Sequence, residues 1–415
     1  MAGQAARRSD RDTSERAGEI ARAGEWELNR RRLIRLACAS LGEIGGGMAL
    51  IANNQSFAGF VHHSPDDTRL IVRTERPLNL ESPTAALDSW LTPIDQFFVR
   101  SHFGAPAVDL HPWELEIDGL VERPRRLSLA ELNRYSQVTL PALLQCSGNG
   151  RTLFRPRIPG IGWERGAVGH AEWTGVRLAD ILNQAGIKPG AAHVQMIGAD
   201  TPPSPKTPAF FRSIPLDRAL APDTLIALRM NGEPLPVLHG GPLRLVVPGW
   251  VGDNWLKWLR MIIVSVDEAP GFYMQTAYRL PKTPLPPGVK PKPAELLPMT
   301  WMNVKSLITW PRAESIVPLG RNEVRGIAWT GQGHVTAVDF TTDRESLWRP
   351  AKLIGEARQG SWRQFRVDWQ PAAPGRYQIR VRATDSHGRV QPEITPWNMS
   401  GYLWNGYDQV ACLVV

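Results

Sequence analysis

The chain has 415 residues, of which 42% are hydrophobic and 21% are charged, with a net charge of +8. This balance excludes a disordered or fibrous protein and allows a sizeable core, which for this length implies two domains. The chain has no long basic block and no repeat of basic and aromatic residues, so nucleic acid is not a favoured partner.

The N-terminal segment carries an export pattern. Residues 29–35 read Asn-Arg-Arg-Arg-Leu-Ile-Arg, which resembles the twin-arginine export signal. The following residues, 36–52, include Glu43 and three consecutive glycines, and are too short and too polar for a stable membrane span. We therefore expect residues 1–58 to form an export signal and arm of a periplasmic protein. A basic arm without a signal function is the alternative.

Residues 59–285 show a mixed pattern that predicts an α+β domain. Short apolar runs typical of strands alternate with short amphipathic segments that begin near turns. The predicted strands are residues 113–117, 194–197, 243–247 and 261–266, and the predicted helical segments are residues 128–134 and 177–185.

Proline dominates residues 281–298, which read PKTPLPPGVKPKPAELLP. Proline fixes φ and lacks a backbone donor, so this segment is predicted to be neither a helix nor a central strand. We expect an extended connector and place the linker at residues 286–298, between a domain at 59–285 and a domain at 299–415.

After this segment the hydrophobic pattern alternates with a period of two. Several short alternating runs separated by turn residues predict an antiparallel β-sandwich of immunoglobulin-like size. The predicted strands are residues 324–329, 334–340, 363–369 and 376–383.

The cysteines give the first indication of chemistry. Three cysteines cannot build a disulfide framework, and the absence of CxxC and CxxCH strings argues against a cysteine-rich zinc or iron–sulfur site and against an attached c-type haem. Cys146 ends an apolar run and precedes a glycine-containing turn and Arg151, whose charge would stabilise a thiolate. From these residues alone, Cys146 could be a buried structural cysteine, a nucleophile or a soft metal ligand.

Six strings, including the one around Cys146, resemble in order and spacing the sulfite oxidase family of molybdenum enzymes, from about residue 75 to the C-terminus. They are Phe-Phe-Val-Arg-Ser-His at 97–102, the string around Cys146, Gly-Ile-Gly-Trp at 160–163, His-Gly-Gly-Pro-Leu-Arg at 239–244, Lys-Trp at 257–258 and Gln-Thr-Ala-Tyr at 275–278. The resemblance implies a sulfite-oxidase-type molybdopterin domain followed by the immunoglobulin-like β-sandwich, which commonly mediates dimerisation, so a homodimer is expected.

The resemblance also implies a molybdenum–molybdopterin cofactor and a role for each matching residue. Cys146 is the expected protein ligand to the metal. Soft thiolates suit such a centre. The expected catalytic residues are Arg100, Arg151, Trp163 and Tyr278, and the expected cofactor-binding residues besides Cys146 are His102, His239, Arg244 and Lys257. Cationic side chains are suitable partners for a pterin phosphate and for a small oxyanion.

The implied function is oxidation of sulfite to sulfate, with electrons passed to a separate acceptor. We expect that acceptor to be a c-type cytochrome, because no haem is expected in this chain. One departure from the family pattern matters. Animal members carry an arginine in a Trp-Asn-x-Arg-Gly string, where this chain has Ser400.

Ser400 keeps a second hypothesis open, in which a molybdenum enzyme of the same fold acts on a sulfoxide, another sulfur compound or nitrate. A non-catalytic binding protein that uses the sandwich is the third hypothesis, and such a protein should contain no molybdenum.

Overall fold

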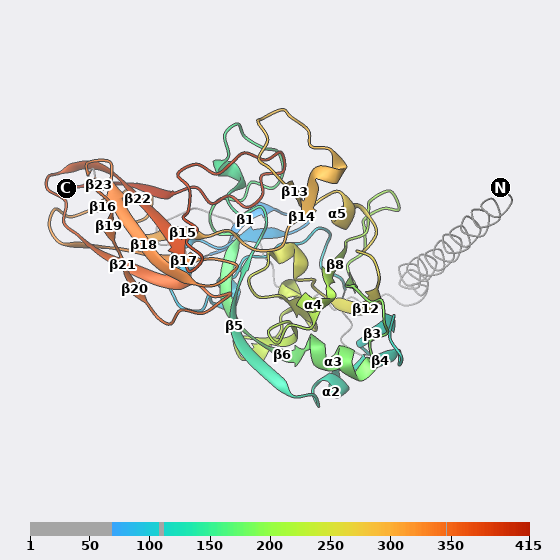
Figure 1. Ribbon diagram of the computed structural model, residues 1–415. Helices are drawn as coiled ribbons and strands as arrows, with labels where there is room; N and C mark the ends of the chain where they lie inside the picture. Colours follow the sequence, from blue (N-terminus) through green and yellow to red (C-terminus); the bar gives the residue numbers. More distant parts are fainter. Residues whose placement is uncertain (1–68, 108–111, 346) are drawn as a thin grey trace, which may run out of the picture. The chain divides into compact units, whose positions relative to one another are not determined.

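The computed structural model describes residues 69–107, 112–345 and 347–415, and these residues belong to one compact unit (Figure 1). The expected export segment, with its arginine pair, lies outside the described residues. Within the part of the chain that is described, no helix is long and apolar enough to cross a membrane.

Two five-stranded sheets form the framework of the first domain. One has the order β10-β9-β6-β5, with β11 also paired to β9, and the other has the order β4-β3-β12-β7-β8. The strands of the first sheet are β5 (Gln137–Gln145), β6 (Val168–Arg177), β9 (Leu225–Met230), β10 (Glu233–Pro234) and β11 (Arg244–Val246), and those of the second are β3 (Glu114–Gly119), β4 (Arg125–Ser128), β7 (His193–Gly198), β8 (Phe211–Pro215) and β12 (Leu259–Ser265). The four strands predicted in this region are confirmed as β3, β7, β11 and β12.

Burial explains the sequence pattern of two of these strands. β12 lies in the middle of its sheet, between β3 and β7, and Met261 to Val264 are all buried, which accounts for its continuous apolar run. β5 is largely exposed at its start and fully buried from Ala142 onward. Cys146 directly follows the buried end of β5 and is therefore buried as well.

Helices are fewer and shorter than an α+β class suggests, and the described fold is mostly β. Only α3 (Leu178–Ala185) exceeds four residues among the described α-helices; the others are α2 (Leu129–Leu132), α4 (Leu216–Ala219) and α5 (Phe272–Gln275). Both predicted helical segments are confirmed as α2 and α3. The side chains of Ser128 and Glu131 form a reciprocal capping box at the start of α2, which satisfies two backbone donors there.

The two ends of the proline-rich segment lie side by side, so the segment is not a straight connector. β13 (Arg279–Pro281) pairs antiparallel with β14 (Leu296–Pro298), so the intervening residues form a closed loop. The sequence predicted neither a helix nor a central strand here, and the segment forms one short 3-10 helix, Pro293–Glu295, and no central strand. The sequence pattern missed the pairing, because the partners of a two-stranded ribbon are set by tertiary contacts.

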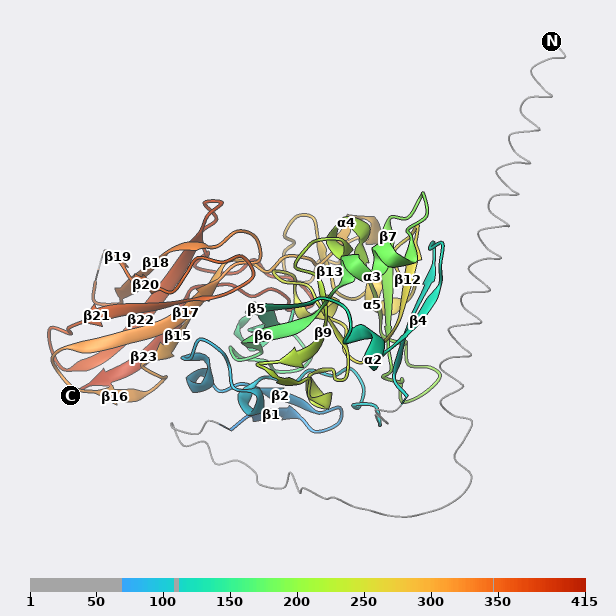
Figure 2. The ribbon, with the colours of Figure 1, turned by 90° about the horizontal axis from the view of Figure 1, so that it is seen from below.

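The second domain is a sandwich of a four-stranded sheet, β15-β17-β21-β20, and a five-stranded sheet, β16-β23-β22-β18-β19. Its strands, in orange and red, form a separate group in both views (Figures 1 and 2). They are β15 (Lys305–Trp310), β16 (Ser315–Val317), β17 (Asn322–Trp329), β18 (Val335–Thr342), β19 (Arg349–Pro350), β20 (Lys352–Ile354), β21 (Arg363–Trp369), β22 (Gly375–Asp385) and β23 (Asp408–Val414). All four predicted strands are present.

The core of the sandwich follows the period of two. Along β22, Tyr377, Ile379, Val381 and Ala383 are buried while the residues between them are not. They belong to one hydrophobic cluster with Phe365 of the facing sheet. A β-sandwich is therefore confirmed, and its immunoglobulin-like character stays a prediction.

The two domains share a hydrophobic core. Trp329, Trp362 and Leu403 of the second domain belong to the same buried cluster as Cys146. The indole Nε1 of Trp329 donates a hydrogen bond to the side-chain oxygen of Gln145 over 2.7 Å. The second domain therefore reaches the residue directly before the cysteine.

Candidate active site

Cys146 lies at the buried end of β5 and begins a tight turn. Its backbone nitrogen donates to the carbonyl of Ala167 over 2.9 Å, and its carbonyl accepts from Asn149 over 3.0 Å. A Cβ atom at Gly148 would lie 2.8 Å from a guanidinium nitrogen of Arg151, and Gly150 has a φ of 90°. Glycine at 150 allows this positive φ, and glycine at 148 leaves room for the guanidinium of Arg151.

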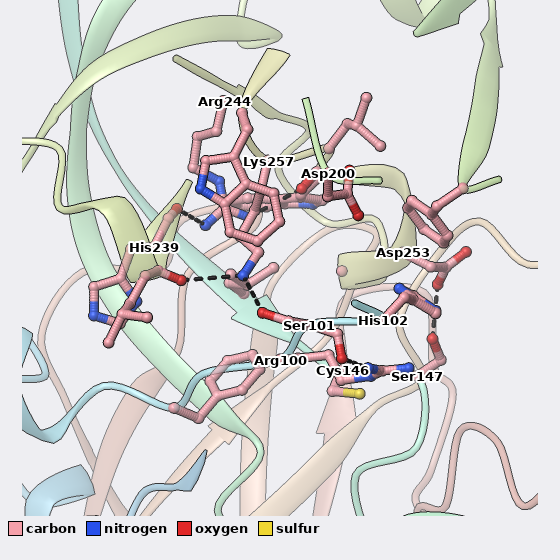
Figure 3. Close-up of a pocket in the computed structure, with 18 of the residues that line it drawn as sticks. Arg100, Ser101, His102, Cys146, Ser147, Asp200, His239, Arg244, Asp253 and Lys257 are labelled. Carbon is pink, nitrogen blue, oxygen red and sulfur yellow. Dashed lines mark hydrogen bonds between the residues drawn. The ribbon is translucent and has the colours of Figure 1, made fainter. Parts of the chain in front are cut away.

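An inner pocket with a cavity volume of about 70 Å³ surrounds this cysteine (Figure 3). Seven of the nine predicted site residues line it: Arg100, His102, Cys146, His239, Arg244, Lys257 and Tyr278. Segments far apart in sequence thus converge on one pocket.

Three predicted cofactor-binding residues form one group in this pocket. Arg244 donates to the carbonyls of His239 (2.7 Å) and Trp255 (3.0 Å), and Lys257 donates to Ser101 Oγ over 2.9 Å. In Figure 3, Lys257 lies between Ser101 and the pair formed by Arg244 and His239. A Cβ at Gly240, where φ is 106°, would lie within 3.1 Å of the side chains of Lys257 and Arg244, so glycine leaves the space that they occupy.

The electrostatics of this group favour an anion. Burial lowers the pKa of Arg244 to about 9 and lowers the pKa of Lys257 well below its usual range, and the charge of Arg244 lowers the latter further. Two carboxylates line the inner pocket. Asp253 is paired with Arg212 at 2.7 Å, and burial raises the pKa of Asp200 to about 6. The buried positive charge therefore exceeds the negative charge, and a bound phosphate would balance it.

His102 and Tyr278 form a close polar pair in the pocket. The Nε2 atom of His102 lies 2.5 Å from the Oη atom of Tyr278. Burial and then the charge of Arg100 lower the pKa of His102 well below its usual value, and burial raises the pKa of Tyr278. The imidazole is therefore neutral and the phenol protonated at neutral pH.

Cys146 itself is buried in a polar surrounding. Burial raises the pKa of its thiol, whereas the guanidinium of Arg100 and the backbone N–H of Gly148 oppose this effect. The adjacent Ser147 donates to Asp253 over 2.7 Å. Because a metal ligand must be deprotonated, binding of a metal here would release the thiol proton.

An outer cavity meets the inner pocket at Arg100, His102 and Tyr278, which line both. Arg151 lines only the outer cavity, together with Ser400. The Nε atom of Arg151 donates to the carbonyl of Ser400 over 3.2 Å, and its guanidinium lies 5.5 Å from the ring centre of Tyr402.

Trp163 has a different environment from the other predicted residues. It is 1% exposed and lines neither the inner pocket nor the outer cavity. Its ring packs edge-on against Phe98, with ring centres 6.4 Å apart, and lies next to Gly148. The structure places Trp163 in the core beneath the cysteine turn.

Several pocket residues were missed by the sequence analysis. Ser101, Asp200 and Asp253 line the inner pocket, and Arg212 supports it through Asp253. Asp200 follows a predicted strand, and a polar residue at a strand end is a usable signal. Arg212 carries no such signal, because its 0% exposure and its partners 41 residues away depend on the tertiary fold.

Comparisons with known proteins agree with this geometry. The model of the oxidoreductase molybdopterin binding domain matches residues 102–273, and that of the Mo-co oxidoreductase dimerisation domain matches residues 298–414. Sulfite oxidase from Gallus gallus is 37% identical over 83% of this chain and 78% of its own length. Sulfite oxidase from Arabidopsis thaliana is 32% identical over 83% of this chain and 94% of its own length.

Two further similarities extend this picture. Nitrate reductase [NADPH] from Aspergillus niger is 32% identical over 84% of this chain, which spans 45% of that protein. The crystal structure of the sulfane dehydrogenase SoxCD from Paracoccus pantotrophus superimposes with a TM-score of 0.71 and 27% identity, over 89% of this chain and 92% of that one. Together with the pocket around Cys146, these similarities show that the chain belongs to the sulfite oxidase family of molybdenum oxidoreductases.

Proposed function

We propose that the chain oxidises sulfite to sulfate and passes the electrons to a separate acceptor. The single observation that carries this proposal is the convergence of Arg100 and the His102–Tyr278 pair on the pocket that holds Cys146. The pocket then combines Arg100, which binds an anion, the His102–Tyr278 pair, which holds a proton, and Cys146, which is a soft metal ligand.

The residues present fit a molybdenum–molybdopterin cofactor. The Cys146 thiolate would hold the metal, and His239, Arg244 and Lys257 would hold the phosphate, whose charge balances the buried cations. When bound, such a cofactor supplies oxygen-atom transfer and two-electron redox chemistry. The protein contributes binding, orientation and electrostatics around it.

The residues that would contact the substrate act through their positive charge and through one proton. Arg100 and Arg151 would bind and neutralise the oxyanion where the two cavities meet. When His102 carries its proton on Nε2, it donates to Tyr278 Oη, which leaves the phenol proton free for an oxygen atom in the pocket. Trp163, held in the core, would support the cysteine turn from below.

The proposal also includes the location of the enzyme, its electron acceptor and its oligomeric state. Twin-arginine export through Arg30 and Arg31 would place it in the periplasm, with a c-type cytochrome as its electron acceptor. The second domain, which matches a dimerisation domain, supports a homodimer. We retain the domain limits 59–285 and 299–415, joined by residues 286–298, as part of the proposal, and we retain an immunoglobulin-like sandwich.

A second candidate is a related reaction on another substrate. Ser400 lines the outer cavity, where animal relatives have an arginine, and a nitrate reductase is among the relatives. Nitrate, a sulfoxide or another sulfur compound would be the alternative substrate.

The deciding experiment measures sulfite-dependent reduction of ferricyanide by purified protein whose molybdenum content is determined on the same sample. Turnover with one metal per chain supports the proposal. A full metal complement without turnover on sulfite contradicts it, and the same sample is then assayed with nitrate and sulfoxides.

A further inference from the structure

The outer cavity is larger and more apolar than a bare sulfite ion requires. Its cavity volume is about 670 Å³, against about 70 Å³ for the inner pocket. Its walls include Phe272, Tyr273, Leu280, Leu285, Val289 and Met399. A small, strongly hydrated dianion gains little from apolar walls, because they cannot replace its hydrogen bonds to water.

Three of these side chains are also unusually exposed for their type. Phe272 is 45% exposed, Val289 47% and Met399 48%, and they come from three separate segments. They line one cavity that shares Arg100, His102 and Tyr278 with the cysteine pocket. Apolar residues gathered in this way at the entrance of a site indicate a ligand with an apolar part.

The charges around the cavity point to an anionic group held by Arg100 and Arg151. Arg100 and Arg151 line it, whereas Ser400 contributes no charge. Arg279 also lines it, but Glu268 pairs with Arg279 at 3.0 Å. Lys290 is exposed on the proline-rich loop, where solvent screens its charge.

We infer that the site also oxidises organic sulfinates, with the sulfinate group at Arg100 and Arg151 and the organic substituent in the outer cavity. This inference rests on the proposed function. A sulfinate resembles sulfite in having a lone pair on sulfur and two terminal oxygens, but it replaces the third oxygen with carbon. It carries one negative charge, whereas sulfite approaches two above neutral pH.

The reaction balances as RSO₂⁻ + H₂O → RSO₃⁻ + 2H⁺ + 2e⁻. A sulfur–oxygen bond forms, the sulfur is oxidised by two electrons and the new oxygen comes from water. The carbon–sulfur bond stays intact. Two equivalents of a one-electron acceptor, a c-type haem protein in the cell or ferricyanide in the assay, take the electrons.

The test uses molybdenum-replete enzyme with sulfite, methanesulfinate and benzenesulfinate. Ferricyanide reduction gives the rates, and mass spectrometry of the sulfonate formed in ¹⁸O-labelled water identifies the product. We expect benzenesulfonate carrying one labelled oxygen and a kcat/KM about tenfold higher for benzenesulfinate than for methanesulfinate, the size of effect that an apolar pocket gives.

A pair of variants tests the placement of the substituent. Val289→Asp puts a charge into the outer cavity. It should lower the ratio of kcat/KM for benzenesulfinate to kcat/KM for methanesulfinate about fivefold or more. Leu319→Asp is the matched control, because Leu319 is also 47% exposed and does not line the cavity. In Leu319→Asp the same ratio of kcat/KM values should stay within about twofold of the wild-type ratio. Equilibrium binding of benzenesulfonate, followed by calorimetry, should weaken in Val289→Asp and not in Leu319→Asp.

The outcomes separate this inference from the proposed function. Turnover of sulfite without turnover of either sulfinate overturns the inference and leaves the proposed function intact. Turnover of benzenesulfinate without sulfite supports the inference and overturns sulfite as the substrate. Turnover of none of the three by replete enzyme overturns both.

Discussion

The side chain of Arg151, five residues after Cys146, donates a hydrogen bond to the backbone carbonyl of Ser400, over 3.2 Å. The two residues are 249 positions apart. The contact makes the second domain part of the outer cavity wall. The guanidinium of Arg151 therefore lies at the boundary between the first and second domains.

Replacing Cys146 by serine tests the metal-ligand role. We expect loss of sulfite turnover and of tightly bound molybdenum, because a hydroxyl is a much harder and less acidic ligand than a thiol. Serine is close to cysteine in size, so the free energy of unfolding should fall by only about 1 kcal/mol. Metal analysis, turnover and urea unfolding of the same preparation provide the check. Normal turnover with sulfite would rule out the role.

Arg100→Gln should weaken sulfite binding far more than cofactor binding. A hydrogen bond to a charged group contributes about 1.5–3 kcal/mol, so the KM for sulfite should rise about 10- to 100-fold. The molybdenum content should be unchanged. Arg376→Gln is the control, because Arg376 is exposed and paired with Glu314 in the sandwich. An unchanged KM in Arg100→Gln would remove this residue from the anion site.

Trp329→Phe tests how the second domain supports the cysteine. The substitution removes the donor to Gln145 and leaves a buried amide oxygen without this partner, which costs about 1–3 kcal/mol. We expect faster release of molybdenum during incubation in low urea, because the support of the residue before Cys146 is weakened. Trp369→Phe makes the same change in the sandwich core and should release molybdenum at the wild-type rate. Equal release from both variants would contradict this positioning role.

Lys305 provides a pH-dependent stability prediction. It is 2% exposed, with Nζ 4.8 Å from the ring centre of Trp404, and burial lowers its pKa from 10.5 to about 7. Between these values the unfolded chain binds the proton and the folded chain does not, so stability rises with pH across this window. Lys305→Met should therefore stabilise the protein most at or below neutral pH, and progressively less towards pH 10.5.

Urea unfolding at about pH 6, 8 and 10 measures this trend. Lys352→Met is the matched control, since Lys352 is an exposed lysine on the same sheet and its replacement should have little effect at any pH. A gain from Lys305→Met that is constant or grows with pH would show that Lys305 keeps its usual pKa in the folded protein.

The export prediction is tested in cells. Replacement of Arg30 and Arg31 by lysine should leave the folded enzyme in the cytoplasm, because the twin-arginine pathway reads the arginine pair. Fractionation and sulfite-dependent activity of each fraction give the result. An unchanged periplasmic yield would refute the signal.

The local sequence determined the elements of this protein and the identity of most site residues. Alternation with a period of two defined the strands of the sandwich, and the amphipathic pattern of residues 128–134 indicated α2, because these patterns depend on neighbouring residues. The family strings identified the seven residues that line the inner pocket, since the types of side chain that bind a soft metal and a phosphate are readable without coordinates.

Only the tertiary structure decided which groups share a pocket and which charges remain unbalanced. Asp253 is paired with Arg212, Arg279 with Glu268 and Arg151 with the Ser400 carbonyl, and each pairing joins separate segments. The core position of Trp163 and the closure of the proline-rich loop by β13 and β14 are equally non-local. Burial, pairing and cavity shape depend on contacts between distant residues, and a pattern along one chain does not contain them.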